Sequence, residues 1–431
     1  MMGKWYLVLC TGLICNMSLK AQYIPALLRH GSVQNTLYNP AIPMKKTINL
    51  GLATINTGLS TDGFALNELT GINQDGARYI DINKIQSIKD GKYNLYFEND
   101  IRTIDVGINL RSFALIAGHG FRMSANAGYT TDLIKLLANG NGSYIGKTLD
   151  IGPALNAMAY NELYIGAQTK LGSLTLGLKA KLLYGTASLY SEVSRMLLTT
   201  KEEFYQLQFE NHYLIRSSSL LKYKSLDDIT IDYAGFTLDN LFYNNRGFAM
   251  DMGVHYQLND RFSLNASALD IGRIDWDYAP RKYETNGIFN FEGVDIIDYI
   301  QDSTLNVRDT LLQLLDVQSS LEPYSTTINS RYTLGADYIL DSWSFHVLYQ
   351  MHRRFGYNWH QMSLGTVKKI SFLDIGLLYT INKSDYRNLG LHIGLNLRPV
   401  HLYVSTTDVL HLLSFENARS AGIGFGLNVQ F

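Results

Sequence analysis

Apolar and polar residues alternate with a period of two in segment after segment of this chain. In SLTLGLKAKLLYG (173–185), leucine, alanine and tyrosine occupy the even positions, whereas threonine, glycine and lysine occupy the odd positions from 175 to 181. The alternation recurs in 247–258, 332–340, 343–349 and 388–398. Because successive side chains of a β-strand point to opposite faces, this pattern predicts strands with one apolar face. The fold class expected is therefore all-β.

Composition agrees with sheets and excludes one class of function. The chain has 29 tyrosines, 36 glycines and only 7 prolines, which suits strands separated by turns better than helices. The formal net charge is −1, and no basic stripe is present. Binding of nucleic acid is therefore not expected.

The predicted strands are long enough to cross a bilayer. Many span about 9 to 12 residues, which is the length that a tilted membrane-spanning strand requires. A soluble sandwich would need a second sheet to cover each apolar face. After the first 21 residues no apolar run reaches about 18 residues, so a membrane-embedded form of this chain must be a closed barrel.

The connections between strands favour the barrel. Fourteen strands are predicted, at 47–55, 102–110, 113–127, 161–170, 174–187, 246–258, 261–270, 329–340, 343–351, 360–368, 371–381, 388–398, 400–406 and 420–431. Every second junction is a tight turn, at 111–112, 171–173, 259–260, 341–342, 369–370 and 399. Short periplasmic turns that alternate with long outer loops are typical of a single transmembrane antiparallel β-barrel. About 14 strands are expected (range about 12 to 16), since a further hairpin within 188–245 would give sixteen.

The chain divides into three predicted parts. Residues 1–21 read as a signal peptide, with Lys4 before an apolar run and cleavage after Ala21. A lipoprotein signal at Cys15 is the alternative, although Ile14 is larger than the residue such processing favours. Residues 22–46 are interpreted as an N-terminal periplasmic or plug segment, and 47–431 as the outer-membrane β-barrel. The expected location is the cell outer membrane.

Two long loops carry helical patterns, and a third carries aromatic and basic residues. Helices are predicted within 299–318 and 130–142, where they would cover the barrel mouth or form a surface that docks a partner. The segment MHRRFGYNWHQ (351–361) is predicted to be an outer loop, beside the aromatic belt or in contact with lipopolysaccharide phosphates.

The stretch GIGFGL (422–427) resembles a dinucleotide-binding loop only superficially. Such a loop must follow a strand and open a helix, and the five residues after Gly426 leave no room for that helix. The stretch is interpreted as a last barrel strand with outward Phe425, Leu427, Val429 and Phe431. These four residues resemble the assembly signal that the barrel-assembly machinery recognises.

No catalytic, cofactor-binding or metal-binding residues are predicted. Both cysteines lie within 1–21, and the scattered histidines form no HExxH or other ligand spacing. No Ser/His/Asp set is legible, so the chain is expected to be no enzyme, although such sets assemble from distant positions. Inward-facing charged residues would line the lumen, where they pair or set its electrostatics: Asp105, Lys179, Lys181, Asp251, His255 and Asp337.

The sequence resembles a family of uncharacterised Bacteroidota outer-membrane β-barrels, known as a domain of unknown function. The resemblance rests on LYNPA (37–41), GFAMDMGVHYQL (247–258), the stretches 267–276 and 291–296, and the glycine-rich last strand. It implies a location and a barrel, and no activity. More distantly, fourteen strands after an N-terminal segment are similar to the long-chain fatty-acid transporter barrels, in which 22–46 would correspond to the plug.

The function expected is therefore passage of hydrophobic or small solutes through a porin-like barrel. The alternative is a barrel that anchors or partners a surface, gliding or type IX secretion complex through its long outer loops. The partners expected are outer-membrane lipid and lipopolysaccharide, the barrel-assembly machinery, and a surface or secretion protein.

Overall fold

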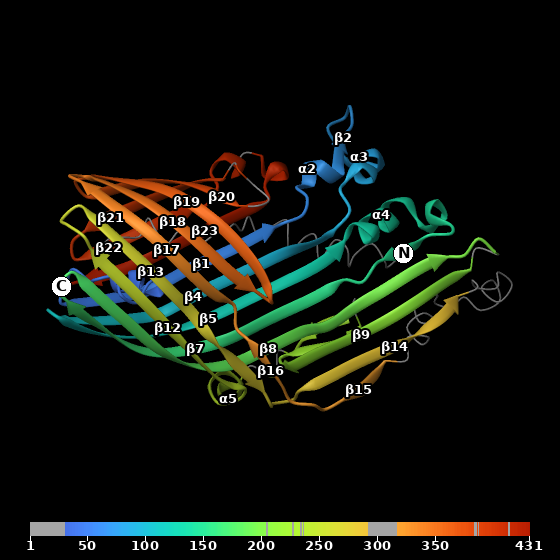
Figure 1. Cartoon of the computed structure of the whole chain (residues 1–431), viewed down its shortest axis with the longest axis horizontal. Coiled ribbons are helices and arrows are strands. Elements are labelled where there is room, and N and C mark those ends of the chain that lie inside the picture. The colour runs from blue at the N-terminus through green and yellow to red at the C-terminus, as the bar shows by residue number, and fades with distance from the viewer. Residues whose placement is uncertain are drawn as a thin grey trace.

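One large antiparallel sheet closes on itself and forms most of the molecule (Figure 1). The computed structural model describes residues 31–203, 206–225, 228–232, 235, 237–291, 317–382, 386, 388–412 and 414–431. Within these residues fourteen strands form a closed barrel. They are β1 (Ile48–Thr61), β4 (Lys92–Leu110), β5 (Phe113–Thr130), β7 (Ala154–Leu171), β8 (Leu174–Thr200), β12 (Arg246–Gln257), β13 (Phe262–Trp276), β17 (Ser330–Leu340), β18 (Trp343–Arg354), β19 (Tyr357–Ile370), β20 (Leu373–Asn382), β21 (Asn388–Leu397), β22 (Val400–Thr406) and β23 (Ser420–Gln430). The predicted barrel and its strand number are confirmed.

The barrel closes where its first and last strands meet. β1 pairs with β23 from Asn49 opposite Gln430 to Ser60 opposite Ser420. At the end of this seam Ile48 and Phe431 exchange two backbone hydrogen bonds of 3.1 and 2.9 Å. Closure leaves neither strand with a free edge, which is the condition for a sheet to lie in lipid.

Six tight turns lie at one end of the barrel, as the sequence predicts. Five lie at or within one residue of the predicted positions. The sixth differs, because β19 continues to Ile370 and the turn is Ser371–Phe372, with Ser371 at φ 56°. β19 is therefore two residues longer at its C-terminal end than the sequence predicts.

The connections at the other end are longer, with one exception. β18 and β19 are joined by Phe355 and Gly356 alone, both at positive φ. The predicted outer loop at 351–361 is therefore wrong, since these residues are a hairpin. His352, Arg354 and Trp359 point inward and are buried, whereas Arg353, Tyr357 and His360 are exposed.

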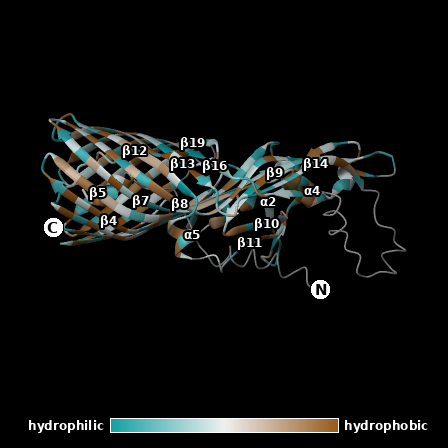
Figure 2. Cartoon of the chain, turned by 90° about the horizontal axis from the view of Figure 1, so that it is seen from below, coloured by the Kyte–Doolittle hydropathy of each residue, from teal (hydrophilic) through white to brown (hydrophobic). Residues whose placement is uncertain are grey.

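Side chains along the barrel strands alternate between a buried and an exposed position. In β20 every second residue from Asp374 to Asn382 is buried, while Ile375, Leu377 and Tyr379 between them are exposed. Figure 2 shows the resulting mixture of apolar and polar stripes along the barrel. The outward side chains are mostly leucine, isoleucine, valine and aromatic residues, so the barrel presents an apolar surface.

A sheet extends past the barrel mouth beside β8 (Figure 1). The far half of β8 pairs with β9 (Leu207–Ser219), and β9 pairs with β14 (Arg281–Phe291). Leu189, Tyr213 and Ile215 form a buried cluster of this extension. The hairpin considered within 188–245 thus exists as strands, but these strands lie outside the ring, and the count of sixteen is wrong.

Short helices and strands occupy the connections at the outer end of the barrel, and one further short helix, η1, precedes β1. The helix predicted within 130–142 is confirmed as α4 (Thr131–Asn139), capped by the Thr130 hydroxyl and ended by Gly140 at φ 70°. The helix predicted within 299–318 lies almost wholly outside the described residues. The other elements are η1 (Val33–Leu37), α2 (Leu66–Leu69), β2 (Thr70–Ile72), β3 (Arg78–Ile80), α3 (Ile82–Ser87), η2 (Asn141–Tyr144), β6 (Thr148–Asp150), β10 (Leu221–Ser225), β11 (Asp228–Ile231), α5 (Leu238–Phe242), β15 (Gln318–Ser320), β16 (Tyr324–Thr327), η4 (Leu410–Leu412) and η5 (Phe415–Asn417). In the part of the chain that the structure describes, no helix is long and apolar enough to span a membrane.

Candidate functional site

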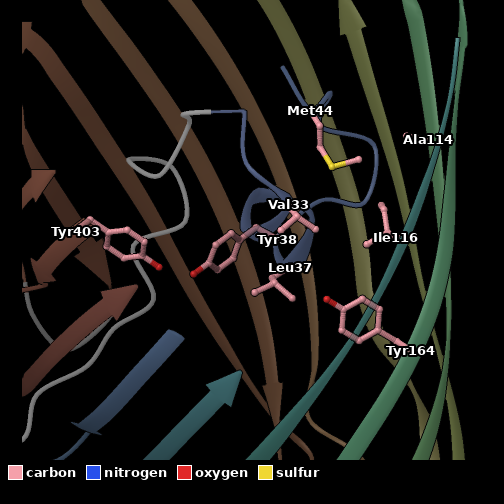
Figure 3. Close-up of a cluster of buried hydrophobic side chains, with 8 residues drawn as sticks. All are labelled: Val33, Leu37, Tyr38, Met44, Ala114, Ile116, Tyr164 and Tyr403. Carbon is pink, nitrogen blue, oxygen red and sulfur yellow. The ribbon is translucent and has the colours of Figure 1, made fainter. Parts of the chain in front are cut away.

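The segment 31–46 lies inside the barrel, in the half that carries the tight turns. Figure 3 shows its apolar side chains packed against the inner wall. Val33, Leu37 and Met44 are buried together with Ile116 of β5 and Tyr164 of β7. Tyr403 of β22, on a different side of the ring, belongs to the same cluster. Residues 1–30, which include the predicted signal peptide, lie outside the described residues.

Polar side chains attach this segment to the wall. Gln168 donates from its amide nitrogen to the carbonyls of Pro40 and Ile42, at 2.6 and 2.8 Å. Asn39 donates to the carbonyls of Val254 and Ala266, each at 3.1 Å. Further bonds join Asn109 to the Met44 carbonyl, Ser267 to the Tyr38 carbonyl and Asn428 to Gln34. Each of these bonds uses a side chain, so the segment adds no strand to the sheet.

Two paired glycines leave the space that the segment occupies. Gly177 of β8 and Gly253 of β12 lie directly opposite each other in the sheet. A Cβ atom at Gly177 would lie 2.2 Å from the Pro40 carbonyl oxygen, and one at Gly253 would lie 2.0 Å from Asn39 Oδ1. The backbone nitrogen of Ala41 would also lie 2.5 Å from the first of these Cβ atoms and 3.0 Å from the second. Because backbone atoms cannot retreat as a side-chain end can, a larger residue at either glycine would exclude the segment. We call Gly177 and Gly253 the glycine cradle.

Further along the lumen lies a belt of buried ion pairs. Arg102 pairs with Asp100 at 2.7 Å and also with Glu162. Lys181 pairs with Asp251 at 2.9 Å and with Asp270 at 2.5 Å. The charge belt, as we call these residues together with Arg122 and Arg331, links seven neighbouring strands from β4 to β17.

Asp270 is the centre of the charge belt. Its carboxylate accepts ion pairs from Arg122 at 2.7 Å, Lys181 at 2.5 Å and Arg331 at 2.9 Å. Asp270 has φ 61°, and both it and Leu269 are buried, which interrupts the alternation of β13. This is a β-bulge, and it directs an extra carboxylate into the lumen. Arg122 in β5 reaches Asp270 over three intervening strands, so the belt closes part of the cross-section.

A third contact joins opposite walls near the outer end. Arg354 of β18 pairs with Glu98 of β4 at 2.9 Å. Six strands separate β4 from β18 on either side of the ring, so this ion pair crosses the lumen. The Arg354 guanidinium also lies over the rings of Tyr96 and Trp359, 5.3 and 5.5 Å from their centres. A cavity of about 30 Å³, which is room for about one or two water molecules, remains between this contact and the charge belt.

All six residues predicted to face the lumen are buried in the barrel interior. Lys181 and Asp251 belong to the charge belt. Asp105 accepts a hydrogen bond from the Tyr164 hydroxyl, and the Lys179 ammonium lies 4.4 Å from the centre of the same ring. His255 and Asp337 lie apart from the belt, nearer the tight turns. There His255 contacts Gln257, and Asp337 contacts His346.

Sequence reasoning missed most of the cations and acids of the belt. Arg122, Glu162 and Arg331 fall on predicted strands at the alternate positions that face inward, so their direction could have been predicted from the sequence. Asp100 precedes the predicted strand, which begins at residue 102, whereas β4 of the structure already begins at Lys92. Asp270 could not be found by parity, because the bulge changes which face its side chain occupies.

The chain matches the model of a protein family whose function is unknown. A family model described as a family of unknown function, DUF5723, matches residues 40–407. The chain belongs to this family. Its matched span covers both the end of the lumen segment and nearly the whole barrel of this DUF5723 member. A search of curated proteins found no match.

Solved structures similar to this DUF5723 chain include two toluene transporters and a porin, all of low sequence identity. The Pseudomonas putida toluene transporter TodX is 10% identical, with a TM-score of 0.38 over 95% of this chain and 93% of that one. The Ralstonia pickettii toluene transporter TbuX is 9% identical, with a TM-score of 0.33 over 91% and 92%. A porin of Rh. blastica has a TM-score of 0.25 at 10% identity, over 89% of this chain and 100% of the other. At these values the function of the chain must be argued from its own residues.

Proposed function

We propose that this chain is an outer-membrane β-barrel that admits small solutes through its lumen, with residues 31–46 as a displaceable plug. A membrane location is supported by the outward side chains. Leu178, Leu182 and Phe248 expose 47, 54 and 50% of their surface, and similar residues surround the barrel. Water would make such a continuous apolar surface unfavourable, whereas lipid covers it. In a closed barrel the backbone N–H and C=O groups of every strand can form hydrogen bonds with neighbouring strands within the bilayer, as in outer-membrane proteins.

The observation that carries the proposal is how the plug is held. It occupies the lumen and is bonded to the wall by side chains, while β1 and β23 close the ring without it. The plug can therefore leave without opening any strand pair. The glycine cradle supports the proposal, because residues without a Cβ atom leave room for the segment at these two positions.

The lumen is closed in this structure, and more than one group of residues blocks the path of a solute. A solute that passes the plug next meets the charge belt, whose ion pairs must separate or rotate aside. Balanced charges line the belt, which suits small polar solutes. Toward the outer end an apolar cluster that includes Leu183, Ile274 and Trp276 lies inside the barrel, and this cluster would favour contact with hydrophobic solutes.

The test compares four proteins in liposomes: the wild type, a deletion of 33–44, the Asp270→Asn variant, and the two changes combined. Entry of arabinose is followed by liposome swelling. The combined variant is expected to admit arabinose fastest and the wild type slowest, because it lacks most of the plug and the central carboxylate of the charge belt. Heat-modifiable migration in gels verifies that each barrel is folded. If the folded combined variant admitted arabinose no faster than the wild type, the proposed passage would be wrong.

A further inference from the structure

A serine, a histidine and an aspartate form a chain of hydrogen bonds inside the barrel near the tight turns. His346 Nδ1 lies 2.8 Å from Asp337 Oδ1. His346 Nε2 lies 3.1 Å from Ser344 Oγ. An ionised carboxylate only accepts hydrogen bonds, so Nδ1 carries a proton and donates it to Asp337. In the neutral imidazole, Nε2 is then the acceptor for the Ser344 hydroxyl, which is the connectivity that activates a serine nucleophile.

The strand geometry explains why these residues meet. Ser344 and His346 are two positions apart on β18, so both side chains point into the lumen. Asp337 lies directly opposite His346 on β17. The Asp337 carboxylate is itself held by Asn265 at 3.1 Å and by Ser263 at 3.4 Å, both from β13. The acid that orients the histidine is therefore fixed by a neighbouring strand.

The serine lies at an accessible place. Ser344 follows the turn between β17 and β18 by two residues, and it is half-buried, whereas His346 and Asp337 are buried. The turn lies at the same end of the barrel as Phe431, where the sheet closes. A solute entering from this end reaches Ser344 before it reaches the charge belt.

We propose that Ser344, His346 and Asp337 hydrolyse small acyl esters that enter the barrel from the end with the tight turns. Ser344 Oγ attacks the acyl carbonyl carbon, and its proton passes to His346 Nε2. The acyl carbon–oxygen bond then breaks, and the same proton goes to the departing alkoxide, which leaves as an alcohol. Water next attacks the acyl-serine, gives a proton to His346, and releases a carboxylic acid while Ser344 regains its proton. Ser344 and His346 are the catalytic residues, and Asp337 is a positioning residue.

This activity goes beyond the proposed passage and does not depend on it, since the serine is reached from one end of the lumen. The sequence alone predicts no enzyme, because the three residues come from two strands and form no contiguous motif. The spacing of serine and histidine in WSFHVLY was the only local signal.

The experiment treats the purified, folded, full-length barrel in detergent with a fluorophosphonate probe and with p-nitrophenyl butyrate. Ser344 is expected to be labelled, as identified by peptide mass spectrometry. Ser344→Ala should abolish labelling and lower hydrolysis at least about 100-fold, whereas Ser342→Ala should change neither. Ser342 is a matched control, since it lies two residues away in the turn and receives a hydrogen bond from Lys368.

Two further variants separate chemistry from structure. His346→Gln leaves Ser344 in place and should also abolish labelling, which gives an independent test if Ser344→Ala folds poorly. Asp337→Asn should lower kcat on the order of 100-fold or more, with little change in KM and an altered pH profile, because the histidine loses the carboxylate that orients it. The proposal is overturned if the folded wild type is not labelled, or if its hydrolysis equals that of Ser344→Ala.

Discussion

At the scale of the residue, Asp270 determines how the interior is arranged. Its carboxylate forms ion pairs with basic side chains from three strands, and its backbone amide donates a hydrogen bond of 2.7 Å to the Asp251 carboxylate. The sequence shows an aspartate at the end of a predicted strand and nothing that distinguishes it from a solvated one. The alternation of inward and outward positions identified Lys181 and Asp251 as lumen residues. It could not predict Asp270 as their neighbour, because a bulge turns this side chain inward. Side-chain direction was thus predictable where strands are regular, and pairing was not.

Replacement of Asp270 by asparagine should destabilise the folded barrel. The variant leaves Arg122, Lys181 and Arg331 with less negative charge in a buried place, and the loss of one member of such a network typically costs about 3 to 5 kcal/mol. Urea unfolding in detergent, followed by gel migration, measures the change. Asp260→Asn is the matched control, because Asp260 is exposed in a turn. Equal midpoints for the two variants would refute a structural role of the belt.

Phe431 tests the predicted assembly signal, which stays a prediction for Phe425, Leu427, Val429 and Phe431. The Phe431 side chain is exposed on the barrel, while its backbone bonds to Ile48 at the seam. Phe431→Asp should lower the yield of heat-modifiable barrel in cells several-fold, because a charge replaces an apolar group that faces lipid. Phe415→Asp, at an exposed position in η5, should leave the yield unchanged. A normal yield from Phe431→Asp would count against the signal.

Among the elements, the central parts of the strands, five of the six tight turns and helix α4 were predictable, whereas the outer ends of several strands were not. The alternation of β12 or β21 is regular enough to place both strands within a residue or two. β8 and β9 instead continue past the barrel because Leu189, Tyr213 and Ile215 build a core of their own, and a pattern along one chain does not reveal that partner. The turn at 355–356 is not evident from the sequence, because the strands beside it carry polar and aromatic side chains that point into the lumen. Such a composition is also typical of a solvated loop. Docking of a surface or secretion partner on the outer loops stays a prediction, as does lipopolysaccharide binding.

The plug should loosen when Asn39 is replaced by alanine. Asn39 donates to two strand carbonyls and accepts from the Ala41 amide at 2.8 Å, so its removal leaves buried groups unpaired at a cost of about 1 to 3 kcal/mol. Hydrogen exchange of the amides in 33–44 should become faster, with strand amides of β12 little changed. Asn358→Ala at an exposed position is the control. Unchanged exchange in 33–44 would show that the plug is held by other means.

At the scale of the whole molecule, a closed wall and a separate plug explain why the lumen is filled and yet able to open. The wall depends on fourteen paired strands and the β1–β23 seam, which the sequence predicts through its alternation and turn spacing. The position of 31–46 inside the wall rests on contacts between residues more than 100 positions apart, such as Gln168 with Pro40, which no local pattern encodes. The family supplies no activity against which to compare this arrangement.

Ionic conductance across a planar bilayer measures whether residues 31–46 seal the lumen. The variant carries valine at both positions of the glycine cradle, Gly177→Val and Gly253→Val, so that the plug cannot seat while every strand pair remains. Gly142→Val is the control, because a Cβ atom there meets nothing within 4 Å. We expect a higher conductance or more frequent openings for the cradle variant than for the wild type and the control. Equal conductance and equal opening frequency in the three folded proteins would show that the segment does not seal the lumen.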